Sequence, residues 1–276
     1  MEKKDEKYDI QKFRAVIEYR KENLQPSFDR LSRKIQWHGG ERVLDIGCGP
    51  GDITRSCILP LLPQNFEKLV CADISPEMLE ICKSEFTGVE NVEFLQMDIR
   101  KSPEESLKGS FNRVFSTHCF MYVSDQKMAL KNVFDLLKPG GDCWINQFAV
   151  PSILQPLFIL AESPKWKEKL HGFRNVHIYP YNEDPNPIAT GTKYMKSVGF
   201  TDISVTIEES YLQMESEILC KCLPNPSKDF KEEDKEELMR DQIEVARSLN
   251  FFKEDFATKL KREPHKFLVF YGRKPQ

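Results

Sequence analysis

Short apolar runs alternate with amphipathic segments along most of the chain. We predict strands over residues 42–47, 68–74, 92–99, 111–116, 142–150, 201–210 and 265–273. Helical patterns cover residues 8–36 and begin again near Gly51 and at Ser75-Pro76-Glu77, where the serine is a helix cap and the proline occupies the first turn. Strands separated by helices of these lengths indicate an α/β fold, with a mostly parallel sheet covered on both faces.

Two segments, residues 151–190 and 211–264, are longer than a connection between elements needs to be. Each follows a strand that is expected to run parallel to the first, so both are expected to emerge at the ligand-binding edge of the sheet. We therefore predict a single domain over residues 1–276, in which an N-terminal helical segment (1–40) and a cofactor-binding core (41–150) are joined by two helical lid insertions that form the substrate pocket. Residues 228–261 of the second insertion have the pattern of an amphipathic helix.

Composition favours a small-molecule or protein substrate. Forty Lys and Arg against 43 Asp and Glu give a formal net charge of −3, so no broad attraction to nucleic acid or to an anionic membrane is expected. The eight cysteines lie mostly inside apolar patterns, as reduced cytosolic thiols do, and their spacing indicates no metal site. With neither a signal peptide nor a membrane span expected, we predict a cytoplasmic protein that is a monomer or a homodimer.

The most informative motif is Asp45-Ile46-Gly47-Cys48-Gly49-Pro50-Gly51, at the end of the first predicted strand. A second acid, Asp73, ends the next strand, and ligands of such sheets bind beyond the carboxyl ends of the strands. Three glycines alone are equally compatible with a tight turn between a strand and a helix. The spacing differs from the dinucleotide pattern G-x-G-x-x-G, and an acid that opens the loop would repel a phosphate but attract a cation.

This loop resembles motif I of the class I S-adenosylmethionine (AdoMet)-dependent methyltransferases. Lys138-Pro139-Gly140-Gly141 and Val198-Gly199-Phe200 are similar to further hallmarks of that group. The resemblance implies a Rossmann-like, mostly parallel seven-stranded sheet whose last strand is antiparallel. It also implies AdoMet as the cofactor and S-adenosylhomocysteine as its product.

The resemblance assigns roles to individual residues. It implies that Asp45 lies near the methionine ammonium group, that the glycines let the backbone approach the cofactor, and that Asp73 accepts both ribose hydroxyls. Asp98 and the backbone N–H of Ile99 are expected at the adenine ring, although such a pair can equally cap a helix. The cofactor-binding residues predicted in this way are Asp45, Gly47, Cys48, Gly49, Gly51, Asp73, Ile74, Met78, Asp98, Ile99 and Ser116.

Several further segments resemble the insect juvenile hormone acid O-methyltransferase family over nearly the full length. They are Tyr19-Arg20-Lys21-Glu22-Asn23-Leu24-Gln25, Lys34-Ile35-Gln36-Trp37, Ser124-Asp125-Gln126, Ser163-Pro164-Lys165-Trp166 and Tyr179-Pro180-Tyr181-Asn182-Glu183-Asp184-Pro185. Members of that family convert juvenile hormone acids or farnesoic acid into methyl esters. The resemblance therefore implies a small lipophilic carboxylic acid as the methyl acceptor.

In that family a Gln and a Trp help to hold the substrate carboxylate. The Gln matches Gln25, but Met121-Tyr122 occupies the position of a His-Trp pair, a departure that bears on juvenile hormone specificity. We predict Gln25, Phe120, Tyr122, Phe148 and Tyr181 as substrate-binding residues. His118 is expected to line the site and to help in positioning, as Gln25 and Tyr122 do, and no residue is singled out as a catalytic base.

Two other functions remain open on the sequence. One is methylation of another small acid or of an amine, and the other is a non-catalytic protein with the AdoMet-binding fold. A carboxylate acceptor agrees with the lack of a conspicuous base, because a carboxylate is already a nucleophile at neutral pH.

Overall fold

A computed structural model describes residues 21, 24–150, 154–173, 179–214, 230–249, 253–254 and 261–276. The chain divides into two compact units. The core unit comprises Ser27–Pro151, Arg174–Ser210 and His265–Gln276, and the insertion unit comprises Met1–Pro26, Ser152–Phe173 and Tyr211–Pro264.

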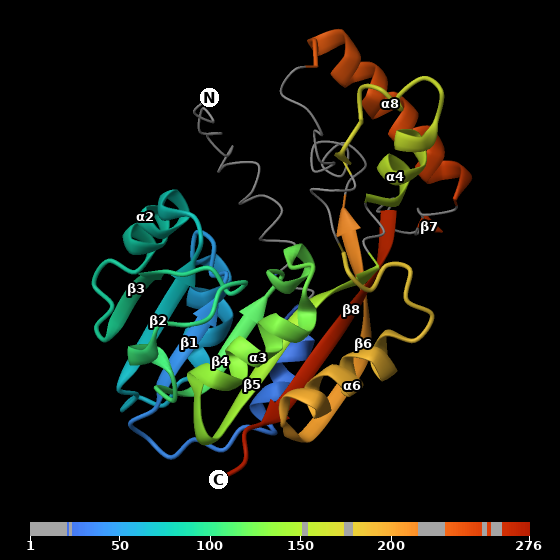
Figure 1. The fold of residues 1–276 in the computed structure, drawn as a ribbon. Helices are drawn as coiled ribbons and strands as arrows, with labels where there is room; N and C mark the ends of the chain where they lie inside the picture. The colour runs from blue at the N-terminus through green and yellow to red at the C-terminus, as the bar shows by residue number, and fades with distance from the viewer. Residues whose placement is uncertain are drawn as a thin grey trace. The chain divides into compact units, whose positions relative to one another are not determined.

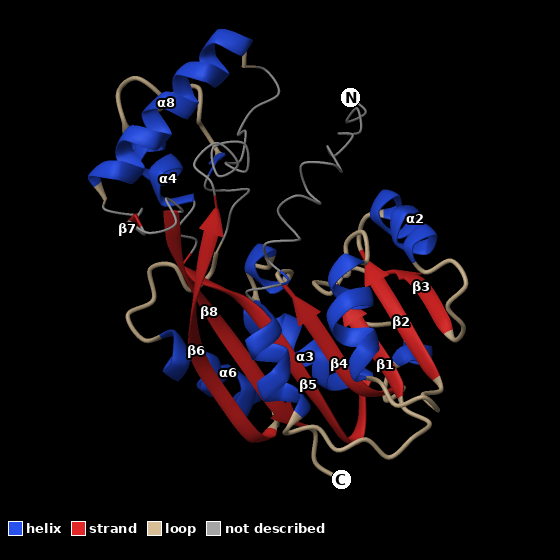
Figure 2. Ribbon diagram, turned by 180° about the vertical axis from the view of Figure 1, so that it is seen from behind, coloured by secondary structure: helices blue, strands red, loops and turns tan. Residues whose placement is uncertain are grey.

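The strands form one sheet in the order β3-β2-β1-β4-β5-β8-β6 (Figure 1; Figure 2). The pairs β1–β2, β1–β4, β2–β3 and β4–β5 are parallel, whereas β5 and β8 are antiparallel. The predicted mostly parallel sheet with an antiparallel last strand is therefore confirmed, and a short additional strand, β7, pairs with the start of β8. The strands are β1 (Arg42–Ile46), β2 (Lys68–Asp73), β3 (Val92–Gln96), β4 (Phe111–Thr117), β5 (Leu137–Val150), β6 (Thr201–Met214), β7 (Lys253–Glu254) and β8 (Lys261–Arg273).

Four strands have boundaries that differ from the predicted ones by several residues. Strand β5 begins at Leu137, because the Lys138-Pro139-Gly140-Gly141 turn bulges out of a strand that already pairs with β4 at Phe111. The register between β4 and β5 shifts at this bulge, and Gly140, with φ of +76°, allows the backbone to make the turn. Strands β6 and β8 extend beyond their predicted ranges, and β3 ends at Gln96, so that Asp98 lies in the loop that follows.

Helices cover both faces of the sheet in the core unit. Helices α3 and α6 pack against each other on the face turned to the viewer in Figure 1. The helical residues 27–32 lie on the opposite face, where the ring of Phe28 is 4.7 Å from that of Trp144. The helical elements of the core unit are η1, a π-helical turn (Thr54–Ile58), the 3₁₀ turns η2 (Leu59–Leu61), η3 (Glu105–Leu107) and η4 (Phe120–Tyr122), and the α-helices α2 (Pro76–Glu85), α3 (Gln126–Leu136) and α6 (Pro187–Val198).

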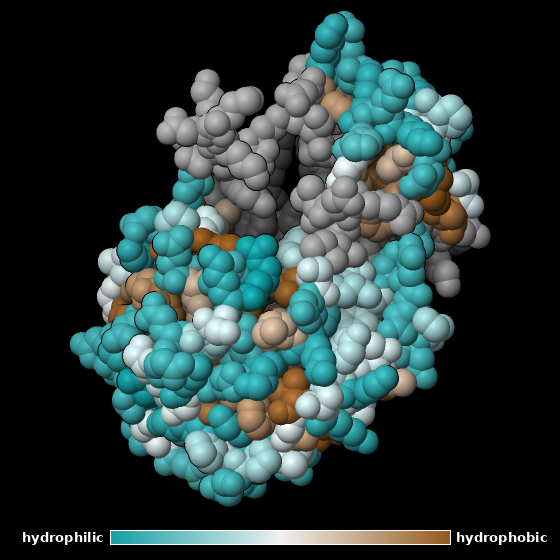
Figure 3. Space-filling view, viewed as in Figure 1, coloured by the Kyte–Doolittle hydropathy of each residue, from teal (hydrophilic) through white to brown (hydrophobic). Residues whose placement is uncertain are grey.

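The apolar core lies between the sheet and these helices. Residues of the central strands, such as Leu44 and Val114, are fully buried, as are Leu130 and Val133 of α3. On the face seen in Figure 3, hydrophobic residues form small separate patches among hydrophilic ones. This distribution is typical of the surface of a globular domain.

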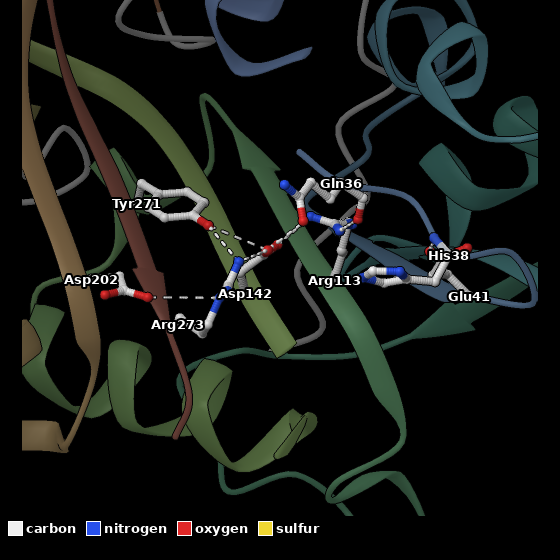
Figure 4. Close-up of polar contacts among 8 residues, drawn as sticks. All are labelled: Gln36, His38, Glu41, Arg113, Asp142, Asp202, Tyr271 and Arg273. Atoms are coloured by element: carbon white, nitrogen blue, oxygen red, sulfur yellow. Dashed lines mark hydrogen bonds and ion pairs between the residues drawn. The ribbon is translucent and has the colours of Figure 1, made fainter. Parts of the chain in front are cut away.

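A buried ion pair ties the amino end of the sheet together (Figure 4). The guanidinium of Arg113 donates from Nη1 to both carboxylate oxygens of Asp142, at 2.8 Å each, and from Nη2 to the carbonyl of Gln36 at 2.6 Å. It also lies 4.4 Å from the centre of the Trp37 ring. These contacts fix the segment that leads from the N-terminal helix into β1.

The insertion unit contains helices α4 (Gln155–Glu162) and α8 (Glu232–Ser248). The indole of Trp166 is buried, stacks on Phe230 and donates to Asp241 of α8 at 2.6 Å. The helix predicted within residues 228–261 is thus confirmed over 232–248, and the remainder of that range includes residues outside the described part of the chain. The expected role of this unit as a lid over the substrate stays a prediction.

In the described ranges, no helix combines the length and the apolar character needed to cross a bilayer.

Candidate active site

Asp45 lies at the end of β1, with its side chain almost completely buried. One carboxylate oxygen, Oδ2, accepts a hydrogen bond from the hydroxyl of Thr54 at 2.5 Å, whereas Oδ1 has no partner among the described residues. Burial raises the pKa of Asp45 to about 7, against the lowering effect of the Thr54 hydrogen bond. A cationic group beside Oδ1 would stabilise the ionised carboxylate, as the predicted ammonium contact requires.

The three glycines of the loop have different surroundings, although all have positive φ. A side-chain carbon on Gly47 would overlap Cys119, and one on Gly51 would come within 2.6 Å of the sulfur of Cys82. A side-chain carbon on Gly49 would meet nothing within 4 Å. Gly47 and Gly51 are therefore needed for packing, and Gly49 is the position at which a ligand can approach the backbone.

Asp73 connects the loop to helix α2. Its Oδ2 accepts from the backbone N–H of Gly49 at 2.9 Å, and its Oδ1 accepts from that of Ser75 at the same distance. The hydroxyl of Ser75 in turn accepts from the N–H of Met78, as predicted for a helix cap. Asp73 thus holds the loop in place, and each oxygen retains a lone pair for a ribose hydroxyl.

Three further predicted cofactor residues, Ile74, Met78 and Cys48, differ in their exposure to solvent. Ile74 is half exposed and Met78 is buried. The thiol of Cys48 packs beneath the loop against Cys71 and Cys82, whose hydrogen bonds, together with burial, hold its pKa above the usual range. Cys48 is therefore a neutral packing residue in this arrangement, and its predicted contribution to cofactor binding stays a prediction.

Asp98 and Ile99 lie in the loop after β3. The Asp98 carboxylate accepts three hydrogen bonds from Arg100, two of them from the guanidinium, and these lower its pKa. Asn132, a residue that the sequence analysis missed, donates to the carbonyls of Ile99 and Lys101 at 2.7 and 3.0 Å. Its signal was a polar residue on the apolar stripe of α3. The adenine contacts of Asp98 and Ile99 stay predictions.

The end of β4 carries Ser116 and His118. The hydroxyl of Ser116 is buried and donates to the carbonyl of Ile46, so it links β4 to β1. His118 has a positive φ of +56°, which is uncommon outside glycine, and its N–H donates to the carbonyl of Asn146 at 2.8 Å. Its imidazole lies 4.8 Å from the ring of Phe148 and 5.4 Å from that of Phe267. Aromatic packing thus places His118 and Phe148 together at the carboxyl end of the sheet.

The remaining predicted substrate residues differ in burial and in the unit to which they belong. Tyr122 is 46% exposed, with its ring 6.2 Å from that of Tyr179, whereas Phe120 is fully buried in the core. Tyr181 is buried, and it lines a cavity of about 410 Å³ between α3 and α6. Gln25 is exposed and belongs to the insertion unit. The predicted convergence of Gln25 and Tyr122 at the reacting atoms therefore stays a prediction.

Comparisons with known proteins identify the family. Residues 43–141 match a family described as a methyltransferase domain. Over 241 residues the chain is 30% identical to the juvenile hormone acid O-methyltransferase of Bombyx mori, in a match that covers 84% of this chain and 85% of the relative. The chain belongs to the juvenile hormone acid O-methyltransferase family.

A second relative supports the same family assignment, and a solved structure shares the fold. The juvenile hormone acid O-methyltransferase of Drosophila melanogaster is 29% identical over 260 residues, covering 89% of this chain and 85% of the relative. Among solved structures, phosphoethanolamine N-methyltransferase 2 of Haemonchus contortus, in complex with AdoMet, aligns with a TM-score of 0.54 and 22% identity. That match covers 89% of this chain and 51% of the other, and it concerns the fold.

The predicted enzyme class and cofactor are confirmed: this member of the juvenile hormone acid O-methyltransferase family is an AdoMet-dependent methyltransferase. Its residues fit the cofactor. The unpartnered oxygen of buried Asp45 suits an ammonium group, and open space at Gly49 allows close approach to the backbone. Asp73 lies next to both, hydrogen-bonded to the Gly49 N–H.

Proposed function

We propose that this methyltransferase esterifies the carboxylate of a lipophilic isoprenoid or fatty acid, such as juvenile hormone acid or farnesoic acid. The observation that carries the proposal is the 30% identity to the Bombyx mori enzyme along 84% of the chain. We expect the enzyme to act in the cytoplasm, as a monomer or a homodimer, without nucleic acid.

The chain's own residues bind and orient the reactants. When bound, AdoMet supplies an electrophilic methyl group, and its sulfur keeps the electron pair of the broken C–S bond, so that the products are a neutral ester and S-adenosylhomocysteine. Asp45 would hold the ammonium group, Asp73 would accept hydrogen bonds from the ribose hydroxyls, and the loop of Ile99 would contact the adenine. The bonds from Asp73 and Asn132 keep these two loops in position.

No residue has to remove a proton from a carboxylate acceptor. The site must instead desolvate the carboxylate and hold one of its oxygens in line with the methyl group. His118 is suited to shaping this site, because its ring packs against those of both Phe148 and Phe267. Gln25 and Tyr122 are the further positioning residues that the family resemblance implies.

Mass spectrometry of the products tests the proposal. The protein is incubated with methyl-labelled AdoMet and a panel comprising farnesoic acid, juvenile hormone III acid, saturated fatty acids, trans-aconitate and primary amines. We expect labelled methyl esters of the isoprenoid or fatty acids. Labelled trans-aconitate ester or methylamine alone would instead support a methyltransferase of another specificity. Absence of both turnover and S-adenosylhomocysteine binding in calorimetry would support a non-catalytic protein.

A further inference from the structure

Asn146 has a buried side-chain amide that makes no hydrogen bond within the described part of the chain. It lies in the middle of β5, is completely buried, and neither its Nδ2 nor its Oδ1 has a hydrogen-bond partner among the described residues. Its neighbour in the register of the parallel strand β4 is Thr117, whose Oγ1 is also buried and also lacks a hydrogen-bond partner in the ranges that the structure describes. Residues paired across adjacent strands face the same side of a sheet, so the two side chains lie next to each other.

Packing alone does not explain this pair. A buried amide without a hydrogen bond is unfavourable, and most buried polar side chains in proteins are paired. Asn132 of this chain follows that rule, since it is equally buried and its amide donates to two carbonyls. An unsatisfied Asn and an unsatisfied Thr side by side are expected where a bound molecule supplies the partner.

The pair lies beside the cofactor residues. In the register of the sheet, Asp45 is aligned with Phe115 of β4, and Phe115 with Trp144 of β5. Thr117 and Asn146 are each two residues further toward the carboxyl ends, so they face the same side as Asp45. Two interstrand spacings, about 10 Å, separate β1 from β5. Asn146 is therefore placed across β4 from the site of the ammonium group.

Aromatic side chains follow this polar pair along the strands. Phe148 follows Asn146 on the same face of β5, and its ring is 4.9 Å from that of Phe267 in β8 and 4.8 Å from the imidazole of His118. Ser27 precedes Phe28, which packs on this face against Trp144, and the buried hydroxyl of Ser27 also has no hydrogen-bond partner among the described residues. Neutral donors next to apolar rings suit a ligand with a small polar head group and a carbon chain.

We propose that Asn146 and Thr117 bind the carboxylate head group of the methyl acceptor and determine its orientation. The Asn146 amide and the Thr117 hydroxyl donate to one carboxylate oxygen, which leaves the other free to attack the methyl group. Neutral donors orient the carboxylate without pairing its charge as a guanidinium would, so its nucleophilicity is retained. This inference rests on the proposed function and assigns a head-group site to it.

Three variants test the inference. Asn146→Leu and Thr117→Val replace each donor by an apolar side chain of similar size. Tyr271→Phe is the matched control, because it removes a hydroxyl from the same face of the sheet at the opposite, amino end, where Tyr271 lies 3.4 Å from Asp142. For each protein, kcat and KM for the acid that the wild type esterifies, the dissociation constant of S-adenosylhomocysteine and the melting temperature are measured.

We expect Asn146→Leu and Thr117→Val to lower kcat/KM about 10- to 100-fold, the effect of losing hydrogen bonds to a charged group. S-adenosylhomocysteine affinity should stay within about twofold of the wild type, and the melting temperature of Asn146→Leu should not fall, because an unsatisfied amide is removed. Tyr271→Phe should retain wild-type kcat/KM.

Wild-type kcat/KM in both site variants would overturn the inference, and so would a loss in Asn146→Leu matched by an equal loss of cofactor affinity. Failure of the wild type to esterify any acid would instead overturn the proposed function and this assignment with it.

Discussion

The side-chain amide of Gln147 in β5 donates to the side-chain oxygen of Gln126 in α3 at 2.9 Å, inside the core. Gln126 makes two further hydrogen bonds, in which its amide nitrogen donates to the carbonyls of Phe120 and Val123 at 2.7 and 2.8 Å. These carbonyls belong to the first residue of η4, the turn that carries Tyr122, and to the residue that follows it. Two buried glutamines therefore hold the turn after β4 in a defined position relative to β5.

Replacing Gln126 by leucine should loosen this turn. The variant removes the hydrogen bonds that Gln126 makes to the Val123 carbonyl and to the Gln147 amide, whereas the Phe120 carbonyl still accepts from the N–H of Val123. We therefore expect a loss of about 2–4 kcal/mol of unfolding free energy. KM for the acceptor should rise several-fold more than the dissociation constant of S-adenosylhomocysteine, because the cofactor loops are untouched. Urea denaturation and steady-state kinetics measure the two effects. Lys131→Ala, which removes an exposed ion pair of the same helix, is the control and should change stability by less than about 1 kcal/mol.

Cofactor affinity should depend on pH through Asp45. Its pKa of about 7 in the unliganded protein lies above the unfolded value of 3.8, so the contribution of this group to stability declines as the pH rises through 7. The ammonium group of S-adenosylhomocysteine favours the ionised form, so its affinity should increase between pH 5 and 7, by at most about tenfold per pH unit. Calorimetry across this range checks the slope, which should vanish in Asp45→Asn. An unchanged slope in that variant would assign the effect to another group.

Local patterns were enough to place Asp45 and Asp73 at the ends of their strands, whereas features that depend on long-range register could not be predicted. Asp45 and Asp73 could be placed from sequence because each ends an apolar run next to a turn. The pairing of Thr117 with Asn146 depends on the register between two strands that a whole helix separates, so no local pattern indicated it. The start of β5 was predicted too late for the same reason, since the strand resumes its pairing with β4 on both sides of a bulge. The relation of Gln25 to Tyr122 depends on how two separate segments dock, which short motifs do not encode.

The glycines of the first loop should respond differently to alanine. Gly47→Ala should unfold or strongly destabilise the protein, because its new methyl group would overlap Cys119. Gly49→Ala should remain folded, with a loss of about 1–2 kcal/mol from its positive φ, but should bind S-adenosylhomocysteine at least tenfold more weakly. Gly88→Ala is the matched control, since Gly88 also has positive φ and open space around it. Equal cofactor affinity in Gly49→Ala and Gly88→Ala would remove Gly49 from the cofactor site.

The buried pair of Arg113 and Asp142 should affect stability and leave cofactor binding unchanged. Both side chains are 8% exposed, and burial raises the pKa of Asp142 even beside the guanidinium. Arg113→Met leaves a buried carboxylate without its main partner, so we expect unfolding free energy to fall by about 3–5 kcal/mol. The double variant Arg113→Met with Asp142→Leu should recover part of this loss, because no unpaired charge remains. Urea denaturation measures the unfolding free energy of both variants. Calorimetry below the unfolding transition should give a wild-type dissociation constant for S-adenosylhomocysteine, because the ion pair lies at the amino end of the sheet and the cofactor residues at the carboxyl end. A weakened cofactor site in the folded double variant would mean that the two ends of the sheet are coupled, in which case the anchored segment around Gln36 transmits the change.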